Sequence, residues 1–100
     1  MTSGYKILWS NHALSELKQT LNYLETKWTV KELRAFSSKL DHVITLISKD
    51  PNLFPVASTK KLIHRAVVDK NNTLYYCVEK EVVQIVSLFS TRQDPDKKRI

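Results

Sequence analysis

Hydrophobic residues in the first half of the chain recur at helical spacing. A first series steps by three and four residues, so its members share one face of a helix. It consists of Leu14, Leu17, Leu21, Leu24 and Trp28. A second series follows with similar spacing and consists of Leu33, Phe36, Leu40, Val43, Ile44 and Ile47. The two stripes predict two amphipathic helices whose apolar faces belong to the core.

Polar residues mark where both predicted helices begin and end. Ser10 can cap the first helix. Thr29, followed three residues later by Glu32, forms a capping-box pattern for the second. Asp50 precedes a proline and therefore disfavours the helical conformation, which ends the second helix there. Because the connection between the helices is very short, they are expected to form an antiparallel pair.

The remaining apolar runs are short, rich in β-branched residues and bounded by turn residues, which is typical of strands. Four strands are predicted: Tyr5 to Trp9, Leu62 to Val68, Thr73 to Glu79 and Val82 to Phe89. Short turns join the last three strands as an antiparallel meander. Residues 57–61 are polar and basic, and we expect a mobile loop there.

These elements predict one α+β domain over residues 1–100, in the order β-α-α-β-β-β. The helical hairpin is expected to pack on one face of a four-stranded, mainly antiparallel sheet. The residues expected to be buried between the two layers are Leu17, Leu21, Leu24, Phe36, Leu40 and Ile44.

Composition and charge narrow the possible partners. The chain carries a net charge of +6, which favours acidic partners such as nucleic acid or a negatively charged protein. Residues 57–100 hold nine basic and five acidic side chains, so the excess leans toward the C-terminal half. Cys77 is the single cysteine, which excludes an intrachain disulfide and fits a reducing cytoplasm. No apolar run is long enough to span a bilayer, and no membrane association is expected.

The sequence lacks the residues that several kinds of binding site require. Gly4 is the single glycine, which excludes a phosphate-binding loop and a dinucleotide fingerprint. His12, His42 and His64 fall in three different predicted elements without metal-ligand spacing, so neither a metal nor a cofactor is expected.

The candidate site is the basic cluster formed by Lys60, Lys61, Arg65 and Arg92. Neighbouring side chains in a strand point to opposite faces, so Arg65 and His64 cannot line one site without a bulge. Arg65 interrupts an apolar run, where a charged side chain needs water, a partner or a ligand. It is either a contact for an anion or a macromolecular target, or a structural arginine paired with a carboxylate.

The order of the elements and the end of the chain together resemble the RelE/ParE family of small bacterial toxins from type II toxin–antitoxin modules, in its ParE-like form. The resemblance runs from Tyr5 to Lys98. After the helical hairpin it rests on the basic second strand, on Leu74-Tyr75-Tyr76, on the Val-x-Ile-x-x-Leu run, and on Thr91-Arg92-Gln93-Asp94-Pro95.

The resemblance implies a growth-inhibiting toxin of the plasmid-stabilisation type that binds an essential target. It also implies a cognate antitoxin as partner in a hetero-oligomer. The ribonuclease branch of the family cuts messenger RNA within the ribosome, with basic residues on the second strand, at the start of the third and after the fourth, and then a Tyr or His. Arg65 and Arg92 match the first and last of these basic positions, whereas Thr73 stands at the middle one and nothing aromatic or imidazole follows Arg92.

Because the chain matches the ribonuclease branch only in part, the gyrase-poisoning branch is favoured. Members of that branch lack a set of catalytic residues, so the chain is not expected to be an enzyme. One alternative is a ribosome-dependent endoribonuclease in which Arg65 and Arg92 stabilise charge. The other is a non-toxic basic binding module.

Overall fold

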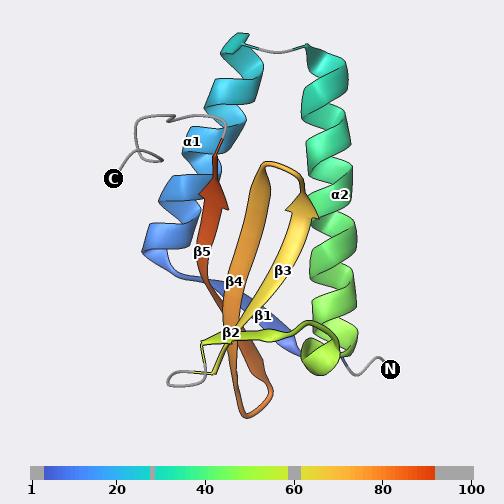
Figure 1. The fold of residues 1–100 in the computed structure, drawn as a ribbon, viewed down its shortest axis with the longest axis vertical. Coiled ribbons are helices and arrows are strands. Elements are labelled where there is room, and N and C mark those ends of the chain that lie inside the picture. The colour runs from blue at the N-terminus through green and yellow to red at the C-terminus, as the bar shows by residue number, and fades with distance from the viewer. Residues whose placement is uncertain (1–3, 28, 59–61, 92–100) are drawn as a thin grey trace.

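Five strands and two long helices make up the part of the chain that the computed structural model describes, residues 4–27, 29–58 and 62–91 (Figure 1). Strand β1 (Lys6–Trp9) leads into helices α1 (Asn11–Lys27) and α2 (Val30–Lys49). A short 3-10 turn, η1 (Pro51–Leu53), follows. The chain then forms β2 (Val56–Ser58), β3 (Ile63–Asp69), β4 (Asn72–Glu79) and β5 (Val82–Ser90).

The helix ends lie where the capping residues predict them. The Ser10 hydroxyl accepts a hydrogen bond from the Ala13 backbone N–H at 3.0 Å, which satisfies a donor in the first turn of α1. The Thr29 hydroxyl accepts one from the Glu32 N–H at 3.2 Å at the start of α2. Asp50 ends α2. Within the described ranges, neither helix combines the length and hydrophobicity needed to cross a membrane.

The sheet has the strand order β1-β5-β4-β3-β2 and is mixed. The β3–β4–β5 meander is antiparallel, as expected, with short turns between its strands. β1 pairs in parallel with the first half of β5, from Lys6 opposite Val82 to Trp9 opposite Ile85. The chain between β1 and β5, which holds both helices and strands β2 to β4, supplies the long connection that a parallel pair requires.

The prediction of a loop over residues 57–61 is wrong where the structure describes that segment. Val56–Ser58 form β2, which pairs antiparallel with β3 and raises the number of strands from four to five. A backbone hydrogen bond of 2.9 Å from the Arg65 N–H to the Pro55 carbonyl continues this pairing. A three-residue edge strand is too short to show the alternation that identifies longer strands.

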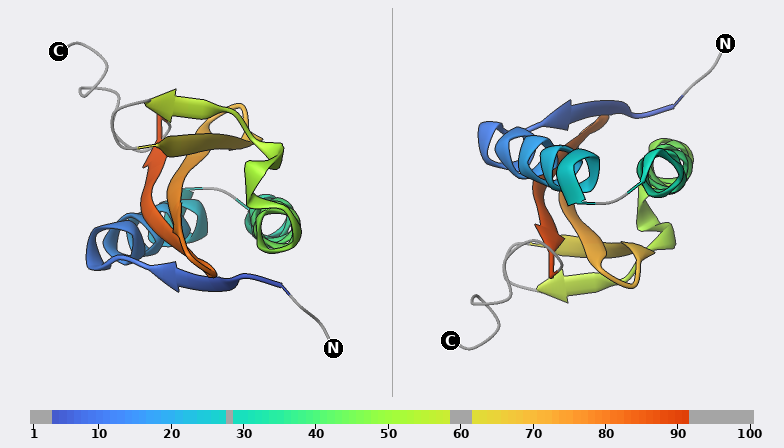
Figure 2. Two further views of the ribbon diagram at one scale, coloured as in Figure 1. Left: turned by 90° about the horizontal axis from the view of Figure 1, so that it is seen from below. Right: turned by 90° about the horizontal axis from the view of Figure 1, so that it is seen from above.

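The two helices cover one face of the twisted sheet, as predicted (Figures 1 and 2). Alternate strand residues point toward them, and the register brings these residues together from neighbouring strands. The buried apolar strand residues are Ala66, Val68, Leu74, Tyr76, Val83, Ile85 and Leu88. The helices contribute Ala13, Leu24, Phe36, Leu40, Val43 and Ile47.

The predicted helix stripes are only partly right. Burial of Leu24, Phe36 and Leu40 is confirmed, whereas three other residues that were expected to be buried remain partly exposed at the margin of the core: Leu17, Leu21 and Ile44. Leu14 is 43% exposed. The reason is that α1 faces the sheet with Ala13, Thr20 and Leu24, so part of its leucine stripe turns outward. Trp28 lies outside the described residues.

Leu24 and Leu14 provide a matched test of this packing. Leu24→Ala should lower the free energy of unfolding by about 2–5 kcal/mol, because its side chain is 1% exposed and its removal leaves a cavity. Leu14→Ala, on the same helix, should cost far less. Urea denaturation followed by circular dichroism measures both values, and similar losses would show that the assignment of the two faces is wrong.

Candidate functional site

The face of the sheet turned away from the helices carries Arg65. Arg65 on β3 lies opposite Tyr75 on β4, and Tyr75 lies opposite Ser87 on β5. The next row along the strands joins Val67, Thr73 and Phe89 in the same way. Because directly paired residues share a face of the sheet, these two rows form one surface. We call it the Arg65 face: Arg65, Val67, Thr73, Tyr75, Ser87 and Phe89.

Arg65 is exposed and is not a structural ion-pair arginine within the described ranges. There, the His12–Glu16 pair on α1 is the ion pair that the structure contains, so Arg65 has no carboxylate partner. β3 is also an inner strand, flanked by β2 and β4. No carboxylate of the described residues pairs with its guanidinium, a group that suits an anion or a carboxylate.

The other three residues of the predicted basic cluster lie outside the described residues. They are Lys60, Lys61 and Arg92. Whether they approach Arg65 stays a prediction. The sequence places Lys61 directly before Leu62 and Arg92 directly after Thr91, close in the chain to β3 and β5.

His64 points into the core, opposite to Arg65, as strand alternation predicts. Its Nδ1 lies 2.9 Å from the Phe54 carbonyl oxygen, and its ring stacks on Tyr76 with centroids 4.9 Å apart. The Tyr76 hydroxyl donates a 2.6 Å hydrogen bond to the Pro51 carbonyl. Burial, with a smaller contribution from the Asp50 charge, raises the pKa of Tyr76 to about 12, so this donor keeps its proton. The pair anchors the η1 segment and does not belong to the exposed site.

Glu16 lies at the edge of the Arg65 face, and the sequence pattern does not reveal its contact with β5. From α1 its Oε1 accepts hydrogen bonds from the Ser87 hydroxyl at 2.7 Å and from the Leu88 backbone N–H at 2.8 Å. Its Oε2 lies 3.3 Å from His12 Nε2. In the sequence, Glu16 is one of several polar residues on the outer helix face, and nothing in the spacing marks a partner more than seventy residues away.

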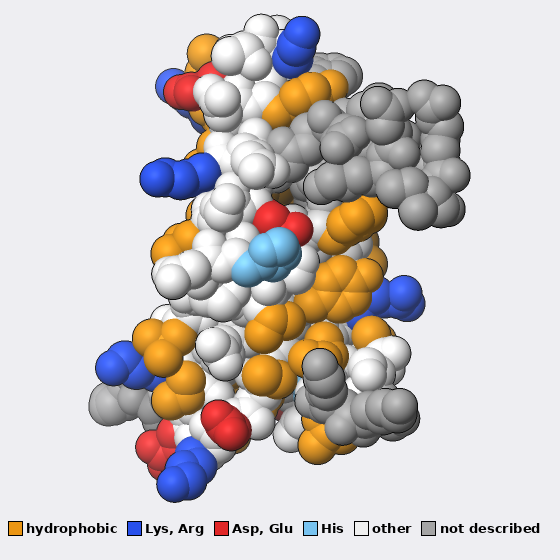
Figure 3. All heavy atoms as spheres, turned by 90° about the vertical axis from the view of Figure 1, so that its left-hand side faces the viewer, with side chains coloured by type: hydrophobic (Ala, Val, Ile, Leu, Met, Phe, Trp, Pro, Cys, Tyr) orange, Lys and Arg blue, Asp and Glu red, His pale blue; other side chains and the backbone are white. Residues whose placement is uncertain are grey.

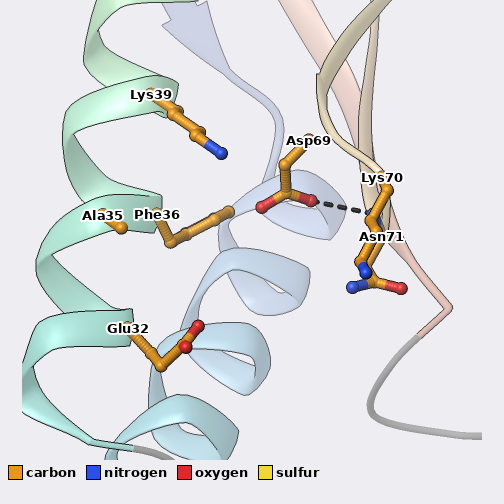
Figure 4. Close-up of a pocket in the computed structure, with 7 residues that line it drawn as sticks. All are labelled: Glu32, Ala35, Phe36, Lys39, Asp69, Lys70 and Asn71. Carbon is orange, nitrogen blue, oxygen red and sulfur yellow. Dashed lines mark hydrogen bonds between the residues drawn. The ribbon is translucent and has the colours of Figure 1, made fainter.

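A groove between α2 and the β3–β4 turn offers little chemistry (Figure 4). Its walls carry both signs of charge, with Glu32 and Lys39 on α2 and Lys70 on the turn. The Asp69 carboxylate at its edge already accepts the Asn71 N–H at 2.8 Å. Mixed charges favour neither an anion nor a cation, and the aspartate stabilises the turn.

Cys77 lies on the same sheet face as Arg65 and is partly buried. Burial, and to a smaller extent the negative charge of Glu79, raises the pKa of the Cys77 thiol. A thiol of this kind is a poor nucleophile at neutral pH, which is consistent with a packing role. Among the described residues, no three His, Cys, Asp or Glu side chains are grouped in a way that could hold a metal ion.

Comparison with known proteins identifies the fold. No family model and no curated protein sequence matches the chain. Solved structures do match, with 9–14% identity in three examples. The chromosomal ParDE toxin–antitoxin system of P. aeruginosa superposes with a TM-score of 0.71 at 9% identity, covering 86% of this chain and 95% of the other.

Two further structures match over a similar span. The E. coli DinJ–YafQ toxin–antitoxin complex has 14% identity and a TM-score of 0.61, covering 89% of this chain and 94% of the other. The YoeB dimer from Staphylococcus aureus also has 14% identity and a TM-score of 0.61, with coverage of 87% and 97%. The chain therefore has the fold of RelE/ParE-type toxins, which confirms the fold that the sequence resemblance implied.

Removing the Glu16 carboxylate should loosen α1 from β5. Glu16→Ala leaves the Leu88 N–H without its acceptor, and we expect the free energy of unfolding to fall by about 1.5–3 kcal/mol. Glu25→Ala, an exposed position of the same helix, is the control and should change it by less than about 0.5 kcal/mol. If urea denaturation shows equal losses of unfolding free energy for the two variants, the hydrogen bonds of Glu16 do not hold α1 to β5.

The alkylation rate of Cys77 tests its environment. The thiolate is the reactive form, so a raised pKa predicts slower reaction with iodoacetamide and a pH–rate inflection above that of the urea-unfolded chain. Glu79→Gln should move the inflection downward, because it removes a negative charge that disfavours the thiolate. An inflection in the folded protein at or below the unfolded value would contradict this description.

Proposed function

We propose that this chain is the toxin of a type II toxin–antitoxin module and that its partner is a cognate antitoxin. The observation that carries the proposal is the likeness in fold over most of the chain to proteins solved as ParDE, DinJ–YafQ and YoeB–YefM. The net charge of +6 adds support, as does the exposed Arg65, which has no carboxylate partner in the described ranges, since a small basic protein suits an acidic antitoxin and an anionic target.

We further propose that the toxin inhibits growth by binding gyrase and not by cutting RNA. Cleavage of RNA requires a general base within hydrogen-bonding reach of the 2′-OH and cations for the developing charge. Thr73 occupies the position where the ribonuclease branch places a second cation, next to Val67 and Phe89. The His12–Glu16 pair could be considered as a general base, but it belongs to α1, and its carboxylate already accepts two hydrogen bonds. These features support a surface that binds over one that catalyses.

Controlled expression in bacteria tests both levels of the proposal. Induction of the wild-type chain should arrest growth, with double-strand DNA breaks and an SOS response but without new messenger RNA ends. Arg65→Ala should raise the expression level needed for arrest about tenfold or more, because an interface arginine commonly contributes this much to affinity.

Arg34→Ala provides the matched control, since Arg34 is an exposed arginine on α2. Equal toxicity of the Arg65 and Arg34 variants would remove Arg65 from the target contact. New RNA ends that disappear with Arg65→Ala would replace gyrase binding with the ribonuclease mechanism. Normal growth with soluble, folded protein would overturn the toxin proposal itself.

A further inference from the structure

The outer edge of β1 carries backbone groups that have no partner among the described residues. β1 is the last strand in the strand order, and β5 covers one side of it. The N–H groups of Lys6 and Ser10 donate to carbonyls of β5, each at 3.0 Å. Because the direction of these bonds alternates along a strand, Ile7 and Trp9 direct their N–H and carbonyl groups to the opposite side.

α2 covers the start of this edge and leaves the rest of it accessible. The Tyr5 N–H, which points in the same direction as that of Ile7, donates to the Ser48 carbonyl at 2.7 Å, near the end of α2. The views from below and from above place β1 at the periphery of the molecule, with no other described element on its outer side (Figure 2). The edge from Ile7 to Trp9 is therefore open to an added strand.

The other edges of the described sheet are less suited to pairing with another chain. β2 has three residues and an irregular register with β3, and short or bulged edge strands resist the addition of a strand. The part of β5 that extends beyond β1 meets Glu16, whose carboxylate accepts the Leu88 N–H. β1 has a regular register with β5, and its Leu8 side chain is 46% exposed.

The sequence of β1 is complementary to itself in an antiparallel arrangement. With Leu8 on a twofold axis, Ile7 lies opposite Trp9 of the partner subunit, and the two residues exchange N–H···O hydrogen bonds. The axis repeats this pair on the other side of Leu8. A β-branched residue opposite an aromatic one is a favourable cross-strand pair, and both side chains already pack against the core. On the outer face, Leu8 and Leu8 of the partner subunit cover each other.

A second copy therefore suits this edge better than an unrelated strand. Lys6 lies opposite Ser10 of the partner subunit in this register, so like charges are not directly opposed. The arrangement is also closed, because each copy covers the open edge of the other and neither is left to add a third chain.

We propose that two copies of this chain associate through β1, antiparallel and with Leu8 on the twofold axis. The two sheets then form one continuous sheet, and the helices of both copies lie on the same face of it. β5 and β4 separate β1 from β3, so the Arg65 face stays uncovered in each copy. A four-residue strand buries little area, and the dimer is therefore in equilibrium with the monomer.

Sedimentation equilibrium of the purified chain, from micromolar to millimolar concentration, measures the association. The wild type should show a monomer–dimer equilibrium. Leu8→Asp should raise the dissociation constant about tenfold or more, because it sets two carboxylates against each other, and Leu8→Lys should do the same with two ammonium groups. An equimolar mixture of the two variants should dimerise again, since opposite charges then meet across the axis.

Hydrogen exchange followed by NMR tests the backbone pairing without any substitution. The amide protons of Ile7 and Trp9 should exchange quickly in dilute protein and slowly in concentrated protein. The Leu8 amide is the internal control, because it is directed to β5 in the monomer and in the dimer alike. This measurement keeps the test decisive if a Leu8 variant does not fold, which thermal unfolding of each variant establishes.

Val30→Asp is the matched control, with the same change from an exposed apolar side chain to a carboxylate. Val30 is 64% exposed and begins α2, at the opposite end of the helix from Ser48, and an aspartate is favourable at a helix N-terminus. This variant should dimerise like the wild type. Figure 3 shows hydrophobic side chains at the surface on the side that carries α1 and β5, where Leu14 borders a shallow apolar hollow. Leu14→Asp should weaken the dimer less than Leu8→Asp does.

The outcomes separate this interface from the proposed function. A wild-type chain that stays monomeric at every concentration would overturn the dimer and leave the toxin proposal untouched. A greater loss in Leu14→Asp than in Leu8→Asp would move the interface to α1. Failure of the mixed variants to dimerise, or fast exchange at Ile7 and Trp9 in a dimer, would exclude pairing in this register. If these amides become protected only when the protein encoded by the neighbouring reading frame is added, the edge belongs to that protein and the proposal is wrong.

Discussion

The geometry of the Arg65 face depends on one extra residue in β5. Tyr75 pairs with Ser87, but the next residue of β4, Tyr76, pairs with Ile85, so Val86 is a bulge. A bulge of one residue reverses the alternation of the strand beyond it. Before the bulge, Val83 and Ile85 face the helices; beyond it, Leu88 does so, and Phe89 is turned outward.

The same bulge determines how α1 meets the sheet. β1 pairs with β5 only as far as Ile85, and beyond that point no strand of the described residues pairs with this edge of β5. The start of α1 supplies the missing partners: the hydroxyl of Ser10, which caps the helix, lies 3.4 Å from the Val86 carbonyl, and Glu16 on α1 accepts the Leu88 N–H. An unpaired strand edge promotes association with other chains, so a carboxylate that occupies it disfavours such pairing. Ser87 donates a hydrogen bond to Glu16 and lies in the same cross-strand row as Tyr75 and Arg65, so it connects α1 to the Arg65 face.

The sequence predicts those features that depend on local chemistry and misses those that depend on distant partners. Thr29 caps α2 and Arg65 faces away from His64 because capping and strand alternation are properties of neighbouring residues. The bulge at Val86 is hidden, since Val82, Val83, Ile85 and Val86 are all apolar and fit either alternation. β2 is too short to show a pattern, and the role of Glu16 appears only when α1 and β5 are placed together. The parallel pairing of β1 likewise depends on all the elements between it and β5.

The separation of the two sheet faces also explains why the fold is recognisable at very low sequence identity. The inner face must fill the space beneath two helices, and many combinations of apolar residues do so at native density, which allows identities as low as 9% at a TM-score of 0.71. The exposed positions of the outer face, Arg65, Val67 and Phe89, have no such constraint, so substitutions there should leave the core intact. The fold positions these side chains but does not require them, so substitutions on the Arg65 face are where an effect on binding can be separated from an effect on stability.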